Sequence, residues 1–321
     1  MIFEKQIIDI FKSNVYTRQD PLGDIFYYTH SDFNGLLASP FEFLGREGQK
    51  LVGNFYYYGE QRFDRLVIFD HGMGNGHVAY MKEIERLCRA GYTVLAYDHT
   101  GCRLSEGEST GGFGKSLSDL DHCIKAVRAT EEYKNTPLSV IGHSWGAFST
   151  MNIGALHPNI THLVALSGFI SVKEILKQFF GGLLSFYQKP AFELERENNP
   201  DYVEYDARVS LTKTNAKVLI IHSEDDKTVN ARKHFEQLKK ALATRPNTQF
   251  LLLKGKGHNP NYTPDAVKYK DDFFAELTRA RKAGELDTAE KRESFVKQFD
   301  WDRMTAQDEE VWGVILEHLD S

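Results

Sequence analysis

The chain has 321 residues, with 39 lysines and arginines against 45 aspartates and glutamates, which leaves a formal net charge of −6. No segment concentrates lysine and arginine, so the composition argues against a phosphate-binding face, and we expect no nucleic acid partner. Nowhere do 18 apolar residues follow one another, and charged residues interrupt the first 14, which predicts neither an integral membrane segment nor a signal peptide. We therefore expect a cytoplasmic protein.

The three cysteines, Cys88, Cys102 and Cys123, are odd in number and show no C-x-x-C spacing. This pattern predicts neither a disulfide framework nor a cysteine-ligated zinc site. We expect reduced, partly buried thiols.

Short apolar runs alternate with segments of helical period from Phe41 onward. The predicted strands lie near 41–45, 51–58, 65–69, 93–101, 138–142, 162–168, 217–223 and 248–255. The predicted helices lie at 78–91, around 120–127, from 147 and at 231–242. Such alternation predicts the α/β class, with a mostly parallel central sheet covered by helices on both faces. We expect one domain over residues 1–321.

Two segments depart from this alternation. Residues 169–211 are rich in aromatic side chains and broken by prolines, and we expect a helical lid in which Phe180 and Phe186 bind an acyl chain. The alternative is that these rings only anchor the insertion to the core. Residues 262–321 form a charged helical C-terminal extension, with a possible capping box at Asp287 and Glu290 and an apolar stripe between Val311 and Leu319.

Ser144 lies between two glycines in the sequence Gly142-His-Ser-Trp-Gly146. The motif follows a predicted strand and precedes a predicted helix, which is the setting of a nucleophile elbow. A serine hydroxyl becomes a good nucleophile when a histidine takes its proton and an acid orients that histidine. The pattern therefore predicts that Ser144 is a nucleophile, with a small packed turn as the alternative.

His258 is the histidine that fits this role, because it lies in a glycine-rich loop after the predicted strand 248–255. His234 and His318 fall on predicted helices and are interpreted as surface or packing residues. The acid is expected from Glu224, Asp225 and Asp226, which follow the strand 217–223, although spacing alone does not separate these neighbours.

An oxyanion hole needs two backbone N–H groups that point at the developing negative charge. Trp145, directly after the serine, supplies the first. Met73, in the glycine-rich turn after the strand 65–69, is expected to supply the second, with its side chain lining the acyl pocket.

Together these motifs, with the triad in the order Ser144, Asp226, His258, resemble the α/β-hydrolase family, within it the monoglyceride-lipase and small-esterase-like branch. The resemblance covers about residues 41–260 and includes the segment "GYTVLAYDHTGCRLSEG". The family pattern D-x-x-V matches "DKTV", which implies that Asp226 and not Asp225 is the acid. Two residues depart from the family pattern: Arg103 stands where the family has a glycine, and Asp70 stands where an apolar residue is usual.

The resemblance implies a serine hydrolase that cleaves a small-molecule carboxylic ester through an acyl-enzyme intermediate, without a metal or organic cofactor. Thioester hydrolysis, acyl transfer and peptide cleavage use the same apparatus. The sequence leaves two alternatives from other functional classes. The first is a dinucleotide-dependent oxidoreductase with Asp98 as the ribose-binding acid, but His77 stands where its motif needs the third glycine. The second is a non-catalytic binding protein on the same scaffold. The natural substrate and the oligomeric state stay open.

Overall fold

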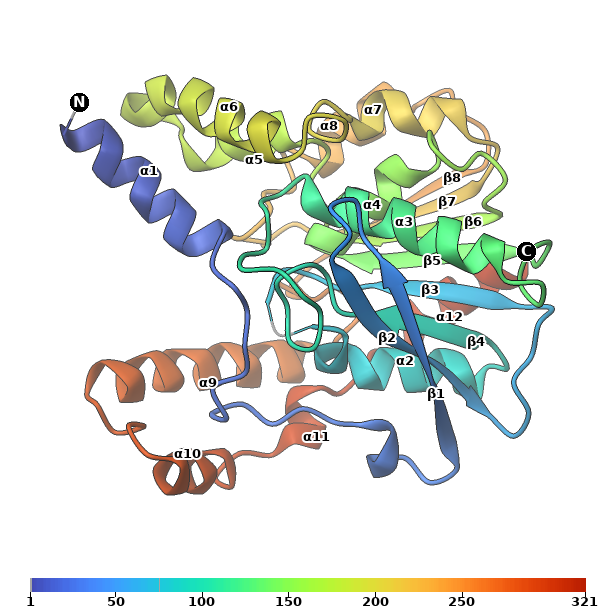
Figure 1. The fold of residues 1–321 in the computed structure, drawn as a ribbon, viewed down its shortest axis with the longest axis horizontal. Coiled ribbons are helices and arrows are strands. Elements are labelled where there is room, and N and C mark those ends of the chain that lie inside the picture. Colours follow the sequence, from blue (N-terminus) through green and yellow to red (C-terminus); the bar gives the residue numbers. More distant parts are fainter. Residues whose placement is uncertain (1, 75) are drawn as a thin grey trace.

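A single eight-stranded sheet forms the centre of the protein, whose computed structural model describes residues 2–74 and 76–321 (Figure 1). The strands are β1 (Leu36–Leu44), β2 (Lys50–Tyr58), β3 (Leu66–Asp70), β4 (Thr93–Tyr97), β5 (Leu138–His143), β6 (His162–Leu166), β7 (Lys217–Ser223) and β8 (Thr248–Leu253). Their order in the sheet is β1-β2-β4-β3-β5-β6-β7-β8. The β1–β2 and β2–β4 pairs are antiparallel and the other pairs are parallel, which confirms the predicted mostly parallel sheet.

Helices cover both faces of the sheet, as predicted. One face carries η2 (His77–Tyr80), α2 (Met81–Arg89) and α12 (Glu309–Asp320). The other carries α3 (Lys115–Ala129), α4 (Trp145–Ile153) and α8 (Phe235–Ala241). In β3 and β5 every residue is buried, as expected for central strands covered on both sides.

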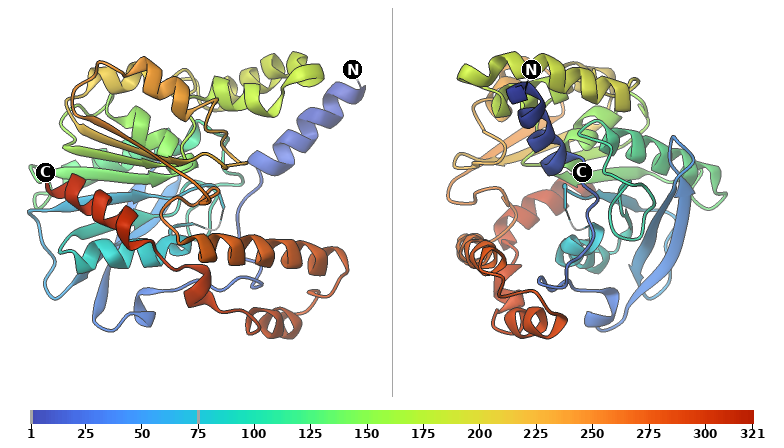
Figure 2. Two further views of the ribbon diagram at one scale, coloured as in Figure 1. Left: turned by 180° about the vertical axis from the view of Figure 1, so that it is seen from behind. Right: turned by 60° about the vertical axis from the view of Figure 1, so that its left-hand side comes forward.

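The segment 169–211 folds into helices, of which the first ones lie beside the N-terminal helix and the last α-helix lies beside α8 (Figures 1 and 2). Its elements are α5 (Val172–Phe179), η3 (Gly182–Tyr187), α6 (Gln188–Asn198), α7 (Ala207–Ser210) and η4 (Leu211–Lys213), and the N-terminal helix is α1 (Ile2–Val15). We call α5, η3 and α6 the cap. Glu195 of α6 fixes the cap to the core, because its carboxylate accepts hydrogen bonds from Phe113 N at 2.9 Å and Gly114 N at 3.1 Å, just before α3.

The C-terminal extension continues from the sheet as α9 (Pro264–Lys282), α10 (Ala289–Val296), α11 (Trp301–Met304) and α12. Helices α9 to α11 have a small core of their own, which also contacts Ile25 of the segment that contains η1 (His30–Asp32). The predicted capping box at Asp287 is wrong: Thr288 is the N-cap of α10 and its side chain accepts a hydrogen bond from Lys291 N. None of the described helices is both long and apolar enough to cross a membrane.

Candidate active site

The residues predicted for catalysis come from loops at one edge of the sheet. Ser144 follows β5, the turn with Met73 follows β3, Asp226 follows β7 and His258 follows β8. Because β3, β5, β7 and β8 run parallel, their carboxyl ends lie along the same edge, where α/β proteins place their sites. The fold therefore brings the four loops together.

Ser144 has the backbone conformation of a sharp strand-to-helix turn, with φ 55° and ψ −109°. Few residues other than glycine adopt this region, and its strain is typical of functional sites. Both glycines of the motif are needed for space: a Cβ on Gly146 would overlap the carbonyl oxygen of Asp70, and one on Gly142 would overlap that of Gly146. The Ser144 N–H donates to Leu166 O at 2.8 Å, which holds the turn against β6.

Asp226 is hydrogen-bonded to His258, with 2.8 Å between Asp226 Oδ2 and His258 Nδ1. The other carboxylate oxygen accepts from the backbone N–H groups of Thr228 and Val229 at 2.8 and 2.9 Å. Burial raises the pKa of Asp226, but the hydrogen bonds from His222 and His258 outweigh it and hold the pKa below its usual range. The buried carboxylate is therefore ionised and orients the His258 ring.

Asp225, the neighbouring candidate, does not contact the histidine ring but binds the loop that carries it. Its carboxylate accepts from Gly255 N at 3.0 Å and Gly257 N at 3.2 Å, and from the hydroxyl of Ser223 at 2.5 Å. Asp225 thus holds the backbone of the histidine loop, while Asp226 holds the side chain.

A chain of hydrogen bonds connects the elbow to the other loops. The Gly72 N–H donates to Tyr80 Oη at 3.1 Å, Tyr80 Oη bonds to His143 Nδ1 at 2.8 Å, and His143 Nε2 bonds to the carbonyl oxygen of His258 at 2.7 Å. Burial, and then the neighbouring His258, lower the pKa of His143 to about 3, so the ring is neutral. The neutral ring receives one hydrogen bond and donates another, and so couples the positions of three loops.

Ser144 lies next to the histidine loop, because the rings of His143 and His258 have centroids 4.8 Å apart. Among the described residues no hydrogen bond joins Ser144 to His258, which is common for catalytic pairs without a bound substrate. Trp145 is the first residue of α4, where helix N–H groups have no intrahelical acceptor. Met73 lies in the turn between β3 and η2.

Asp70, the unusual residue before this turn, is part of a buried polar cluster. Its carboxylate accepts from Tyr97 Oη at 2.8 Å and from Ser149, and lies 3.1 Å from His99 Nε2. Asp119 lies on the other side of the His99 ring, at 3.3 Å. Burial lowers the pKa of His99, but Asp70 and Asp119 outweigh it and raise the pKa to about 9, so an imidazolium balances the carboxylates beneath the turn.

Comparison with known proteins finds similarity over parts of the chain. A family model described as serine aminopeptidase, S33, matches residues 61–214. A monoglyceride lipase homolog of Monkeypox virus is 27% identical over 113 residues, which are 34% of this chain and 40% of that protein. An uncharacterized protein of Acanthamoeba polyphaga mimivirus is 23% identical over 66% of this chain and 73% of its own length.

Solved structures extend the similarity over most of the chain. An esterase of Pyrococcus furiosus superposes with a TM-score of 0.60 at 21% identity, covering 89% of this chain and 98% of the esterase. An acetyl xylan esterase of Thermoanaerobacterium gives a TM-score of 0.55 at 17% identity, over 83% and 94% of the two chains. These similarities to solved structures show that the chain has the α/β-hydrolase fold.

The range matched by the family model contains the turn with Met73 and the turn with Ser144 but ends before Asp226 and His258. For these two residues the support is structural: they follow β7 and β8, at the same edge as Ser144.

The two lid residues differ in their environments. Phe180 is 5% exposed and packs its ring against Phe11 of α1, with centroids 5.6 Å apart. Phe186 is 65% exposed and contacts the ring of Tyr187 at 4.2 Å. Acyl binding by either ring stays a prediction. The packing of Phe180 fits the alternative, in which the ring attaches the insertion to the rest of the protein.

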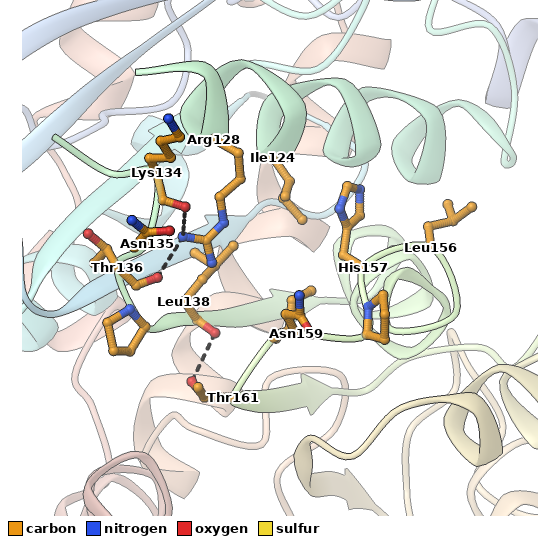
Figure 3. A pocket seen from close by; sticks show the side chains of 13 residues that line it. Ile124, Arg128, Lys134, Asn135, Thr136, Leu138, Leu156, His157, Asn159 and Thr161 are labelled. Carbon is orange, nitrogen blue, oxygen red and sulfur yellow. Dashed lines mark hydrogen bonds between the residues drawn. The ribbon is translucent and has the colours of Figure 1, made fainter. Parts of the chain in front are cut away.

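A cavity of about 500 Å³ lies at the opposite edge of this α/β-hydrolase sheet, near the amino ends of β5 and β6 (Figure 3). Arg128 reaches into it, but its guanidinium donates to the carbonyl oxygens of Tyr133, Lys134 and Thr136. His157, also on its wall, is 2.7 Å from Asp121. These charged groups are engaged within the protein, and the cavity lies at the opposite edge of the sheet from Ser144.

The sequence did not predict a role for Tyr80, His143 or Lys270, which all lie near the loops that carry Ser144 and His258. His143 precedes the nucleophile and could have been noticed from its position in the motif. Tyr80 and Lys270 carry no motif, because a tertiary contact alone brings them to the site: Lys270 Nζ donates to Asn259 Oδ1 at 3.0 Å.

Proposed function

We propose that this α/β hydrolase is a serine hydrolase that cleaves a small-molecule carboxylic ester through an acyl-enzyme intermediate. The observation that carries the proposal is the 2.8 Å hydrogen bond between buried Asp226 and His258, on a loop adjacent to the strained Ser144 turn. Acyl transfer requires a nucleophile, a base and an acid that orients the base. Ser144, His258 and Asp226 offer these three groups at the ends of three parallel strands.

In the proposed mechanism His258 Nε2 takes the proton from Ser144 Oγ as this oxygen attacks the ester carbonyl carbon. Asp226 keeps the proton of the imidazole on Nδ1 and stabilises the imidazolium that forms. The backbone N–H groups of Met73 and Trp145 bind the oxyanion, and the alcohol leaves with the proton from His258. Water, activated by the same histidine, then attacks the acyl-enzyme, and the acid leaves with Ser144 restored.

Labelling with a fluorophosphonate tests the nucleophile, because an activated serine attacks phosphorus and becomes covalently modified. We expect peptide mapping to find the adduct on Ser144, and Ser144→Ala to lose turnover of 4-nitrophenyl esters by about six decades. Ser185→Ala, an exposed serine of the cap, is the matched control and should retain both labelling and turnover. An adduct on another residue, or turnover by Ser144→Ala, would contradict the assignment.

Thioester, acyl-transfer and peptidase activity are alternatives that a parallel assay with thioester and aminoacyl anilide substrates separates. The dinucleotide-dependent alternative is disfavoured by the surroundings of Asp98. Its Oδ1 accepts from the His77 backbone N at 3.0 Å and lies 2.7 Å from His77 Nδ1, and the side chain is fully buried. Asp98 is thus engaged within the protein and not presented to a ribose.

A further inference from the structure

A second cavity lies beside the oxyanion turn and has a wall that the C-terminal extension provides. Its volume is about 180 Å³. Gly72, Met73 and Tyr80 line it, together with Phe273 of α9 and Trp301 of α11. The family model ends at residue 214, so α9 and α11 lie outside the range that it matches.

Lys270 gives this cavity a basic side chain. It lies on α9, lines the cavity, and has its ammonium 5.0 Å from the centre of the Tyr262 ring. One hydrogen bond, to Asn259 Oδ1, engages the ammonium, which has three N–H donors. Among the described residues no carboxylate forms an ion pair with it.

Burial lowers the pKa of Lys270, and the charges of Glu83 and Asp271 oppose this shift. Glu83 is buried and accepts a hydrogen bond from Asn261 Nδ2 at 3.1 Å. Burial raises the pKa of Glu83, which reduces the negative charge that it offers to the lysine. A cation in apolar surroundings that lacks an ion-pair partner is stabilised by an anionic ligand.

We infer that this cavity binds the far end of a short acyl chain that terminates in a carboxylate, and that Lys270 is the residue that recognises the carboxylate. The inference rests on the proposed function, since the oxyanion turn would hold the scissile carbonyl at the mouth of the cavity. The methylenes between the two groups would pack against Met73 and the aromatic wall. The charge of Lys270 disfavours a substrate with a free ammonium group in this cavity.

The test compares two substrates that differ in one charge: mono-4-nitrophenyl adipate, and its analogue with the remote carboxylate methylated. With spontaneous hydrolysis subtracted, we expect the kcat/KM of the wild-type protein to be at least about tenfold higher for the carboxylate, as a charge-assisted hydrogen bond predicts. The ratio of the two constants is the readout, because changes in folded fraction or in the histidine loop affect both substrates equally.

Lys270→Met should lower this ratio by about 10- to 100-fold, and Lys270→Arg should retain most of it. Lys268→Met is the matched control: this lysine lies on the same helix with 80% of its side chain exposed and pairs with Asp272 at 3.1 Å. It should leave both constants unchanged.

The outcomes separate the two proposals. If the wild-type protein hydrolyses neither ester, the proposed function fails. If it hydrolyses both with a ratio near one, or if Lys270→Met leaves the ratio unchanged, ester hydrolysis stands and carboxylate recognition is overturned. A charge preference found only with 4-acetoxybenzoate against its methyl ester would place the anion on the leaving alcohol and overturn the acyl-side assignment.

Discussion

Asp225 and Asp226 are adjacent in one loop, yet one binds a backbone and the other a histidine ring. Periodicity and spacing predicted Ser144 and His258, because each follows a strand in a recognisable sequence context. They did not separate the two aspartates, since neighbours in a loop differ only in where their side chains point. The D-x-x-V resemblance selected Asp226, and the hydrogen bond to His258 Nδ1 agrees with that choice.

Asp226→Asn should lower kcat for an ester substrate by about four decades, because the amide favours the wrong histidine tautomer. Asp225→Asn should retain most of kcat but lower the melting temperature, since its carboxylate holds the backbone at Gly255 and Gly257. Steady-state kinetics and thermal denaturation of both variants check this. The opposite ranking of the kinetic losses would make Asp225 the orienting acid.

At the scale of elements, apolar periodicity predicted the sheet and the helices that cover it. It did not predict which side chains of the cap are buried. The predicted helix 231–242 is shorter in the structure, where α8 spans Phe235–Ala241. An aromatic-rich insertion has no single periodicity from which the buried face can be assigned. Phe180 and Phe186 lie six residues apart, but one packs on α1 and the other is mostly exposed.

Phe180→Ala should lower the free energy of unfolding by about 3–5 kcal/mol, because it leaves a cavity against Phe11. Phe186→Ala, at an exposed site of the same cap, should change it by less than about 0.5 kcal/mol. Chemical denaturation measures both. Comparing short and long acyl esters in the two variants then tests the lid: a changed chain-length profile in Phe186→Ala supports acyl binding, and an unchanged profile contradicts it.

Glu195 makes the attachment of the cap dependent on pH. Burial raises the pKa of Glu195 to about 7, with the hydrogen bonds from Phe113 and Gly114 opposing the shift, while an unfolded glutamate titrates near 4.5. The folded state therefore binds the extra proton between these pH values, and its stability falls as pH rises from 4.5 to 7. We expect the melting temperature of Glu195→Gln to decline less over this range than that of the wild-type protein.

The matched control for this titration is Glu193→Gln, because Glu193 is on the same helix but exposed and paired with Arg196. Its melting curve should follow the wild-type pH dependence. Equal slopes in Glu195→Gln and the wild-type protein would show that another group titrates in this range.

On the scale of the whole molecule, the C-terminal extension has two structural roles that composition does not separate. Helices α9 to α11 form a satellite core beside the catalytic edge, while α12 packs on the sheet with Val311, Trp312, Ile315 and Leu319 buried. The apolar stripe predicted the buried face of α12, but where the helix docks depends on β6 and β7, which end 143 and 86 residues before α12 begins. Long-range docking of this kind leaves no local signal.

Trp312→Ala should lower the free energy of unfolding by about 3–5 kcal/mol, because this fully buried indole fills the space between α12 and the sheet. Glu317→Ala, on the exposed face of the same helix, should have little effect. Urea denaturation of both variants measures the difference. A loss of similar size in both would indicate a general loss of helix propensity instead of packing.

Helix α12 also has a consequence for synthesis of the chain. The apolar face that it covers on β6 and β7 is complete once residue 223 has been made, but the helix ends 97 residues later, at residue 320. At ordinary rates of translation this interval lasts roughly 5 to 20 s. During that time the nascent protein carries an uncovered hydrophobic surface, so ribosome-bound chains stalled before Glu309 should require a holding chaperone that the released protein does not.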